Sequence, residues 1–369
     1  MAEYDIKGWL DQCYQNKVNA LFKGPPGVGK SAIVDEIVRK YDLVGVTKIG
    51  SICDPTDFGG QPQIVPGSDY YKLVASEFVH IIRAAAAEGR GTYVFIDEIF
   101  DSPRAVQAAL QRMIHERVVG DVSLPTDTWF VAAGNPAEYS TNGTDLSGPL
   151  ANRFVHATFS ASVDDFCQNF GGYWGNPPDP KKHGWNATSE ELAMSRSWIA
   201  GLIKSKPDCL LDFPKDEDKR SEAWPSPRTW EVVSRFVAKD LKNPQLHLVE
   251  SAVGRGAAMS LVQWLKTADL PDPETVLANP AKFVVPSRID LAYAVLSSVH
   301  TAVKGKMTEA RWHAEWKVLD MVNKSGSMKD VATVWARQAA RIMPTGSKVP
   351  PEVMSFAKIL SEAGITFGK

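Results

Sequence analysis

Short apolar runs alternate with amphipathic helical segments through the first 160 residues of the chain. Such runs suit buried strands, whereas apolar residues at i and i+4 suit one face of a helix. The helical spacing is clear at 31–40, where Ile33 and Ile37 form one such pair, and again at 76–88. Strands that alternate with helices predict an α/β core with a parallel sheet between the helices. The five predicted strands are 18–22, 43–49, 92–98, 127–136 and 155–158.

The pattern changes at residue 160, beyond which almost no strand signal remains. Thr188–Glu191 fits a capping box and predicts a helix that runs to about Lys204. We therefore divide the chain into an α/β core at 1–159, a helical domain at 160–280 and a helical extension at 281–369. Further helices are predicted at 246–270, 287–305, 307–323, 329–342 and 350–363.

A glycine-rich stretch between the first strand and the first core helix carries the main chemical signal. Gly24–Ser31 fits G-x-x-x-x-G-K-[ST], a loop that cradles nucleotide phosphates with its backbone N–H groups and a helix N-terminus. Lys30 would reach the outer phosphates, and the Ser31 hydroxyl would bind Mg²⁺. The alternative is a Gly/Pro-rich turn that binds nothing, which the flanking strand and helix disfavour. The motif comprises Gly24, Pro25, Pro26, Gly27, Val28, Gly29, Lys30 and Ser31.

Polar residues follow two of the predicted strands where each strand ends. Asp97 and Glu98 close one apolar run, and Asn135 closes the next. Carboxyl ends of parallel strands meet at the edge where open α/β sheets bind ligands. We expect Asp97 to hold Mg²⁺ through water, Glu98 to polarise the attacking water, and Asn135, beside Asp97, to fix that water. Taken alone, Asp97 and Glu98 fit the plain end of a strand as well as they fit a functional role. Taken alone, Asn135 fits a turn residue before Pro136 better than a functional role.

Composition sets the broad class. The chain has 369 residues with 44% hydrophobic and 23% charged, as in ordinary globular proteins, and a net charge of −2. Residues 281–369 hold 13 Lys and Arg against 7 Asp and Glu, a net +6. Four scattered cysteines predict free thiols in a reducing compartment. With no membrane-length apolar run and no signal-peptide pattern at Met1–Leu10, we expect a cytoplasmic protein.

Together these residues resemble an AAA+ ATPase. Gly24–Ser31 matches its Walker A motif and Val94–Glu98 its Walker B motif, and Asn135 resembles sensor 1. Arg153, in Leu-Ala-Asn-Arg-Phe, resembles the arginine finger, and Arg228, in Pro-Ser-Pro-Arg, resembles the sensor 2 arginine of the lid. The likeness covers about residues 18–270.

Within AAA+ proteins the sequence is most similar to the MoxR branch. Asp57–Gly60 resembles the stretch beside that branch's helix-2 insert, and Ala108–Arg117 resembles its helix before the pre-sensor 1 hairpin. The usual sensor 1 sequence Ala-Thr-Gln-Asn-Pro reads Ala-Ala-Gly-Asn-Pro here. Nothing in 281–369 shows a recognisable likeness.

The resemblance implies a fold, cofactors and an assembly. The fold is a P-loop AAA+ core with a five-stranded parallel sheet, followed by a helical lid at 160–280, and the cofactors are ATP and Mg²⁺. AAA+ proteins form rings, usually hexamers, in which Arg153 acts on the neighbour's nucleotide. Apart from the resemblance, phosphoryl transfer needs positive charge that the P-loop alone does not supply. We expect Arg153 at the C-terminal edge of the sheet, pointing outward. The alternative for Arg153 is a surface arginine at a helix end. The alternative for Arg228 is an arginine that merely starts a helix.

Three functions compete. The leading one is a MoxR-like ATPase that remodels or matures a protein client, which in that branch a partner with a von Willebrand factor A domain often presents. Its ring axis would be lined by the loops 59–72 and 119–127, with Tyr70 and Tyr71 either contacting the client or buried in the core. The second is a nucleic-acid motor of the MCM or McrB kind, which an isoelectric point of about 6.4 disfavours. The third is an assembly scaffold with little turnover, which the intact Asp97–Glu98 pair disfavours.

Overall fold

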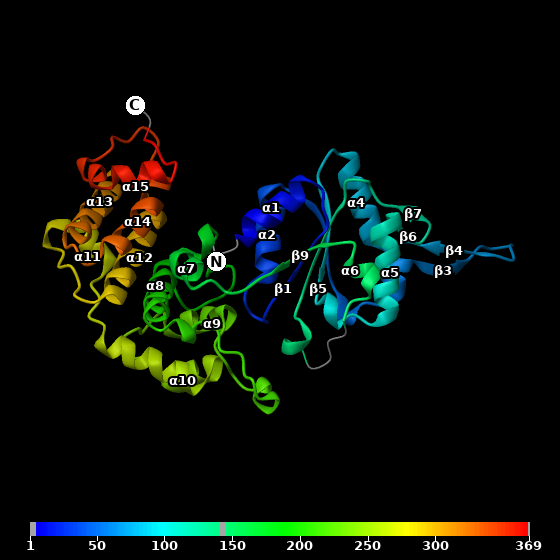
Figure 1. Ribbon diagram of the computed structural model, residues 1–369, viewed down its shortest axis with the longest axis horizontal. Helices are drawn as coiled ribbons and strands as arrows, with labels where there is room; N and C mark the ends of the chain where they lie inside the picture. The colour runs from blue at the N-terminus through cyan, green and yellow to red at the C-terminus, as the bar shows by residue number, and fades with distance from the viewer. Residues whose placement is uncertain (1–4, 141–144, 368–369) are drawn as a thin grey trace. The chain divides into compact units, whose positions relative to one another are not determined.

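The chain divides into two compact units, Met1–Ser160 and Ala161–Lys369, and each is described by itself (Figure 1). The computed structural model describes residues 5–140 and 145–367. In this part of the chain, no helix combines the length and the apolar character that crossing a membrane requires.

A five-stranded sheet forms the centre of the first unit. Its strand order is β2-β5-β8-β1-β9 and every neighbouring pair runs parallel. The predicted fold class is therefore confirmed, and all five strands lie within two residues of their expected starts. The strands are β1 (Ala20–Lys23), β2 (Val44–Ile49), β5 (Thr92–Asp97), β8 (Trp129–Gly134) and β9 (Val155–Thr158).

Two apolar cores cover the two faces of this sheet. On one face, α1 (Ile6–Gln15) and α2 (Lys30–Lys40) pack against Phe22, Phe95 and Val131. On the other, α4 (Glu77–Ala87) and α5 (Arg104–Glu116) pack against Ile96 and Phe130. Residues adjacent in one strand, such as Phe95 and Ile96, face opposite cores because side chains alternate along a strand. A strand buried on both faces is apolar throughout, which explains why continuous apolar runs predicted these strands correctly.

Two small hairpins are added beside α5. The short helix α3 (Pro55–Gly59) leads into β3 (Gln61–Ile64) and β4 (Tyr71–Val74), which form an antiparallel hairpin. The strands β6 (Val118–Val119) and β7 (Val122–Ser123) form the second hairpin. The sequence predicted an irregular loop where β3 and β4 form, because Pro62 weakens the strand signal. α6 (Gly148–Ala151) completes the unit between β8 and β9.

The second unit is helical. One hydrophobic core joins residues from Phe166 to Leu360, so segments from both 160–280 and 281–369 contribute to it. The division of this unit into two domains at residue 280 stays a prediction, and both segments share this core. The principal helices are α7 (Val163–Asn169), α8 (Ser189–Ser205), α9 (Pro227–Val237), α10 (Leu246–Thr267), α11 (Pro273–Ala278), α12 (Ile289–Gly305), α13 (Glu309–Lys324), α14 (Lys329–Arg341) and α15 (Ala357–Glu362).

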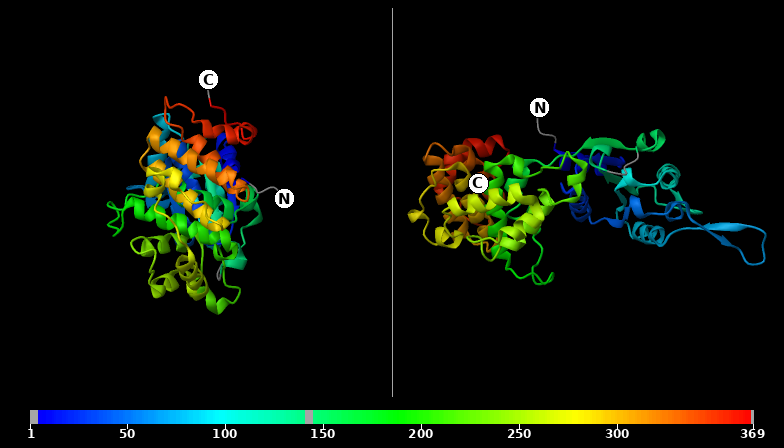
Figure 2. Two further views of the ribbon diagram at one scale, coloured as in Figure 1. Left: turned by 90° about the vertical axis from the view of Figure 1, so that its left-hand side faces the viewer. Right: turned by 90° about the horizontal axis from the view of Figure 1, so that it is seen from below.

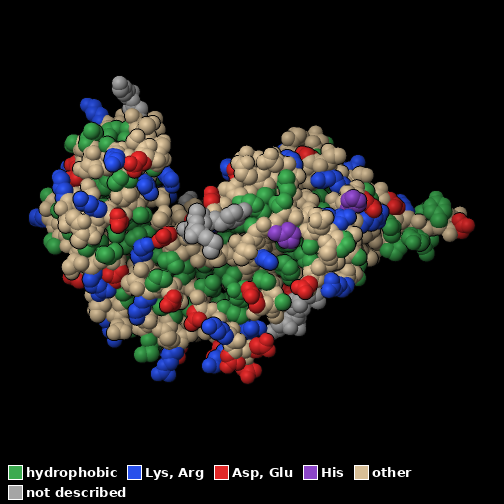
Figure 3. Space-filling view, in the orientation of Figure 1, with side chains coloured by type: hydrophobic (Ala, Val, Ile, Leu, Met, Phe, Trp, Pro, Cys, Tyr) green, Lys and Arg blue, Asp and Glu red, His purple; other side chains and the backbone are tan. Residues whose placement is uncertain are grey.

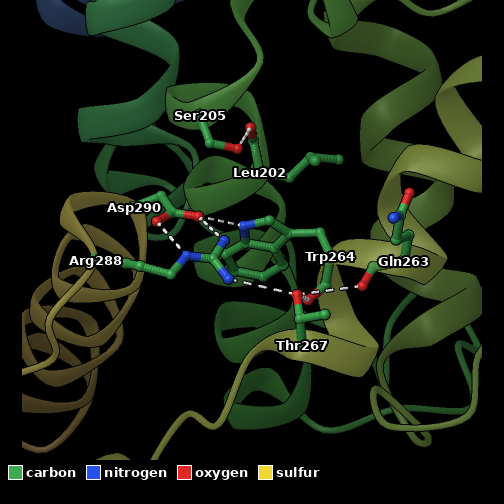
Figure 4. A network of polar contacts seen from close by, with 7 residues as sticks. All are labelled: Leu202, Ser205, Gln263, Trp264, Thr267, Arg288 and Asp290. Atoms are coloured by element: carbon green, nitrogen blue, oxygen red, sulfur yellow. Dashed lines mark hydrogen bonds and ion pairs between the residues drawn. The ribbon is translucent and has the colours of Figure 1, made fainter.

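A charged network joins the end of α10 to the start of α12 (Figure 4). Arg288 donates to both carboxylate oxygens of Asp290, at 3.1 Å from Nε and 2.5 Å from Nη2. The indole Nε1 of Trp264 donates to Asp290 Oδ2 at 2.6 Å. Burial raises the pKa of Asp290, but the hydrogen bonds from Arg288 and Trp264 outweigh it and hold the pKa below its ordinary value. The ionised carboxylate therefore stabilises this junction.

We predict that Asp290→Asn lowers the free energy of unfolding of the helical unit by about 1–3 kcal/mol, the range for hydrogen bonds to a charged group. Because the native pKa is depressed, the stabilisation by Asp290 is complete above about pH 4 and is lost as the pH falls through the native pKa. Urea unfolding followed by tryptophan fluorescence measures this, since nine of the 11 tryptophans lie in this unit. The gap between wild type and variant should narrow in acid, and the exposed Asp269→Asn serves as control. A gap that stays constant with pH contradicts the role given to the carboxylate.

Candidate functional site

The glycine-rich loop connects the carboxyl end of β1 to the amino end of α2. Gly27 and Gly29 have φ of 74° and 98°, a region that residues with a side chain rarely adopt. At Gly24 a Cβ atom would lie 2.1 Å from the carbonyl oxygen of Phe159, so this position has no room for one. The loop conformation thus depends on glycine at three positions of the motif.

Lys30 is the buried cation of the site. Its side chain belongs to the first residue of α2, and the residue is 8% exposed. Nζ donates to the carbonyl oxygens of Gly24 at 2.9 Å and Pro25 at 2.7 Å, and to Asn135 Oδ1 at 2.7 Å. Asn135 follows β8, the neighbour of β1, so one ammonium group joins the loop to the next strand. This places positive charge where the motif predicts the outer phosphates.

Ser31, in the first turn of α2, is hydrogen-bonded to Asp97, the last residue of β5. Ser31 Oγ donates to Asp97 Oδ2 at 2.6 Å, and Asp97 Oδ1 accepts from the backbone N–H of Glu98 at 2.9 Å. A hydroxyl beside one carboxylate suits Mg²⁺, which prefers oxygen ligands and takes the remainder from phosphates and water. Within the described residues, no three His, Cys, Asp or Glu side chains gather as a metal site. The pair therefore fits a cation that arrives with a nucleotide.

Glu98 is held by a residue that the sequence did not reveal. Ser51 Oγ donates to Glu98 Oε2 at 2.5 Å, and Glu98 itself has a φ of 55° in the left-handed region. Ser51 is the second residue after β2, the neighbour of β5, and lies at the same edge of the sheet as Glu98. The rule that pointed to Asn135, a polar residue after a predicted strand, applies equally to Ser51 and could have found it.

Arg153 lies at the opposite edge of the sheet, so its predicted place at the C-terminal edge is wrong. It comes between α6 and β9, and its backbone carbonyl accepts from Asn19 Nδ2 at 3.1 Å. Asn19 precedes β1, which shows that Arg153 lies where the parallel strands begin. The error arose because Arg153 follows β8 in sequence, whereas in space α6 has already returned the chain to the start of β9. The guanidinium Nη1 donates to the carbonyl oxygen of Pro149.

Arg228 belongs to the second unit, where it is the second residue of α9. Ser226 caps this helix by accepting from the Thr229 N–H at 3.3 Å. Arg228 is exposed and makes no hydrogen bond or ion pair with any residue that the structure describes. Its sensor role stays a prediction.

A cavity of about 460 Å³ adjoins the first residues of the loop. Gly24 and Pro25 line it together with residues that follow β8 and β9, including Tyr139 and Phe159. Its size falls in the range of small-molecule sites, and it opens at the carboxyl ends of the strands, where open α/β sheets bind ligands.

A comparison with known families gives one match. Residues 19–154 match the family described as AAA domain (dynein-related subfamily). Residues 19–154 are an AAA+ ATPase domain. The match begins before β1 and ends after Arg153, so it includes the loop, Asp97, Glu98 and Asn135. The predicted enzyme class, ATP hydrolase, is confirmed, whereas the MoxR branch stays a proposal.

Solved structures add only distant similarity. Thermotoga maritima RuvB with the substitution T158V is 14% identical, covering 99% of this chain and 95% of that chain, with a TM-score of 0.37. A putative ATPase from Cytophaga hutchinsonii is 16% identical, covering 70% of this chain and 78% of that chain, with a TM-score of 0.32. Similarity at this level supports no inference about the activity of this chain. Among curated protein sequences there is no match.

We predict that Ser51→Ala raises the basal ATPase rate of the AAA+ domain by about threefold to tenfold, the equivalent of one hydrogen bond. The Ser51 hydroxyl occupies an oxygen of Glu98 that would otherwise accept the proton of the attacking water. Steady-state turnover at saturating ATP measures the effect, and Ser51→Thr, which keeps the hydroxyl, should behave as wild type. A slower Ser51→Ala enzyme would show instead that Ser51 orients Glu98 for catalysis.

Proposed function

We propose that this chain is a MoxR-like AAA+ ATPase that works in a ring, usually a hexamer, and uses Mg²⁺ and ATP to remodel or mature a protein client. One observation carries the proposal: Lys30, Asp97, Glu98 and Asn135 share one edge of the sheet, while Arg153 lies at the other. The charged side chains needed for phosphoryl transfer then come together only when two subunits contribute to one nucleotide site.

Each residue at the carboxyl edge has a separate task. Bound ATP supplies the phosphoanhydride, and its Mg²⁺ neutralises charge on the phosphate oxygens. The loop N–H groups and Lys30 hold the phosphates, with Ser31 and Asp97 orienting the metal's shell. Glu98 takes a proton from the attacking water and Asn135 orients that water. All five side chains lie at or just after strand ends or at a helix start, which keeps them in place without ordering a loop first.

Arg153 completes the charge set of a neighbour. β1 has four residues, so at about 3.3 Å per residue its ends are separated by about 10–13 Å. Arg153 lies beyond the starting end, and its guanidinium contacts Pro149 on the same side. Its own loop lies beyond the other end of β1. Charge at the transferring phosphoryl group is therefore supplied by Arg153 of an adjacent copy. Arg228 of α9 would be the second cation at the same nucleotide.

A protein client fits the surface better than a nucleic acid. The net charge of −2 provides no general field that attracts phosphates. The hairpin β3–β4 exposes apolar side chains, as a surface for protein contacts does. A partner with a von Willebrand factor A domain that delivers the client belongs to the same proposal. All four cysteines carry free thiols, which suits the cytoplasm.

We predict two kinds of defect from three single substitutions at the shared site. Lys30→Ala should abolish ATP binding, because the phosphates lose their main cation. Glu98→Gln should bind ATP but hydrolyse it about 100-fold or more slowly, since an amide is not a base. Arg153→Ala should also bind ATP and turn over slowly. Binding of a fluorescent ATP analogue and phosphate release measure the two properties; hydrolysis at the wild-type rate by Glu98→Gln would refute its assignment.

Mixing two inactive variants tests whether the site is shared. Lys30→Ala subunits keep Arg153, and Arg153→Ala subunits keep the loop, so some mixed interfaces regain both. Activity should reappear on mixing and should rise with protein concentration as the ring assembles. The matched control is a mixture of Lys30→Ala subunits with Glu98→Gln subunits, because both kinds of subunit keep Arg153. If the first mixture stays inactive while sizing shows mixed rings, the arginine does not act between subunits.

We further predict that the ATPase distinguishes protein from nucleic acid. Reduced, carboxymethylated α-lactalbumin, a permanently unfolded protein, should raise turnover at least about twofold by occupying the client surface. Double-stranded DNA at low salt should leave turnover unchanged. Stimulation by DNA alone, lost as salt increases, would favour the nucleic-acid motor instead.

A further inference from the structure

The hairpin of β3 and β4 extends away from the sheet of the first unit as a thin arm (Figures 1 and 2). Ile64 is 78% exposed, and Tyr70 and Tyr71 are each 62% exposed, so the aromatic residues are not part of the core. Figure 3 shows hydrophobic side chains gathered on this projection. An isolated two-stranded hairpin is marginally stable by itself, which makes an uncovered apolar arm unusual.

The arm has one apolar and one polar face. Strand register pairs Pro62 with Leu73 and Ile64 with Tyr71, so these four side chains share a face. The opposite face carries Gln61, Gln63, Lys72 and Val74.

The second hairpin already occupies part of the outer edge of β4. The backbone N–H of Leu73 donates to Asp121 Oδ2 at 2.8 Å, and the Leu73 carbonyl accepts from the Asp121 N–H at 3.0 Å. The β6–β7 turn also packs closely here, since a Cβ on Gly60 would lie 2.3 Å from the Gly120 Cα. Asp121 thus binds β4 much as a short added strand would, using both outward backbone groups of one residue.

The next outward pair on β4 belongs to Tyr71. In an antiparallel ladder, bonded and non-bonded pairs alternate, so if Leu73 faces outward, Tyr71 does too. The bond from the Val65 N–H to the Tyr70 carbonyl, at 3.3 Å, agrees with this alternation. Among the described residues, no partner takes the outward N–H and C=O of Tyr71. The edge of β3 is different, because Pro62 has no N–H to offer there.

We propose that the β4 edge at Tyr71 binds an extended segment of a client protein by strand addition. The proposal rests on the proposed function for the existence of a client and adds its mode of capture. A residue paired with Tyr71 would place its side chain beside Tyr71 and Ile64, and its neighbours would lie beside Lys72. Lys72 is exposed and makes no ion pair among the described residues. The segment is therefore apolar at alternate positions and acidic between them.

A second copy of the arm does not fit this edge. If β4 of another copy paired antiparallel with Tyr71 opposite Tyr71, its residue 69 would lie opposite Leu73. Asp121 already occupies that position through two hydrogen bonds. The edge is open only from Tyr71 toward the tip, which suits a flexible segment that can turn away at the Asp121 contact. Binding at so short an edge is weak and adaptable, with backbone bonds giving affinity and side chains giving preference.

The test compares two substitutions of the same residue in the full-length chain. Tyr71→Pro removes the outward N–H but no bond of the β3–β4 ladder. Tyr71→Val keeps the N–H and has a side chain close in size to that of proline, so the pair differs mainly in the N–H. The probe is a fluorescein-labelled peptide, Gly-Glu-Val-Glu-Val-Glu-Val-Glu-Gly, titrated by fluorescence polarisation. We expect Tyr71→Pro to weaken binding about fivefold to tenfold relative to Tyr71→Val, as loss of one hydrogen bond implies. Ile64→Ser should weaken it as well, and Gln63→Ser, on the polar face, should not.

Each other result overturns the proposal. Equal affinity of Tyr71→Pro and Tyr71→Val would exclude backbone pairing, and no binding by wild type would exclude the edge as a peptide site. Equal binding of a peptide with its valines grouped together would indicate general stickiness of the apolar face. Self-association in sedimentation velocity that Tyr71→Pro abolishes would make a second copy the occupant. All four variants should retain the basal ATPase rate. If peptide binding is weakened by Tyr71→Pro but an unfolded protein does not stimulate turnover, the proposed function is refuted while the peptide site at the β4 edge stands.

Discussion

A buried ammonium group holds the nucleotide site together. Lys30 Nζ contacts two carbonyl oxygens of its own loop and the amide oxygen of Asn135. Burying a charge costs free energy unless all of its hydrogen-bond donors have partners. The Lys30 ammonium donates to three acceptors, which follow the neighbouring strands β1 and β8. The curled loop, the start of α2 and the end of β8 are therefore mutually dependent. Loss of any one would leave the cation or its acceptors without a partner.

The same edge of the sheet relates the chemistry to the hairpins. Glu98 directly follows β5, and α5 begins six residues later and leads into β6. Asp121, in the β6–β7 turn, is bonded to the backbone of β4, so the two hairpins behave as one body attached to the end of α5. A change around Glu98 that displaces α5 would consequently displace both hairpins. This continuous path gives the proposed client arm a physical connection to ATP hydrolysis.

The helical unit has a different organising constraint. Its core includes residues from α7 through α15, and the Arg288–Asp290–Trp264 network fastens α12 to α10 (Figure 4). The segment 281–369, for which the sequence showed no resemblance, is thus built into the same core as the segment that resembles a lid. Any motion of the lid helices would carry this extension with them.

The sequence alone determined the sheet, the loop and most of the site. Strands buried on both faces are apolar throughout, and the loop needs glycine and lysine at fixed spacing, so Lys30, Ser31, Asp97 and Glu98 were visible as local patterns. Only the tertiary structure decided which residues meet across strands. Ser51 and Glu98 are 47 positions apart in the sequence, and Leu73 and Asp121 are 48 positions apart. No local pattern encodes such pairs. The edge at which Arg153 lies was likewise decided by the return of the chain through α6, because sequence order does not state where a crossover ends.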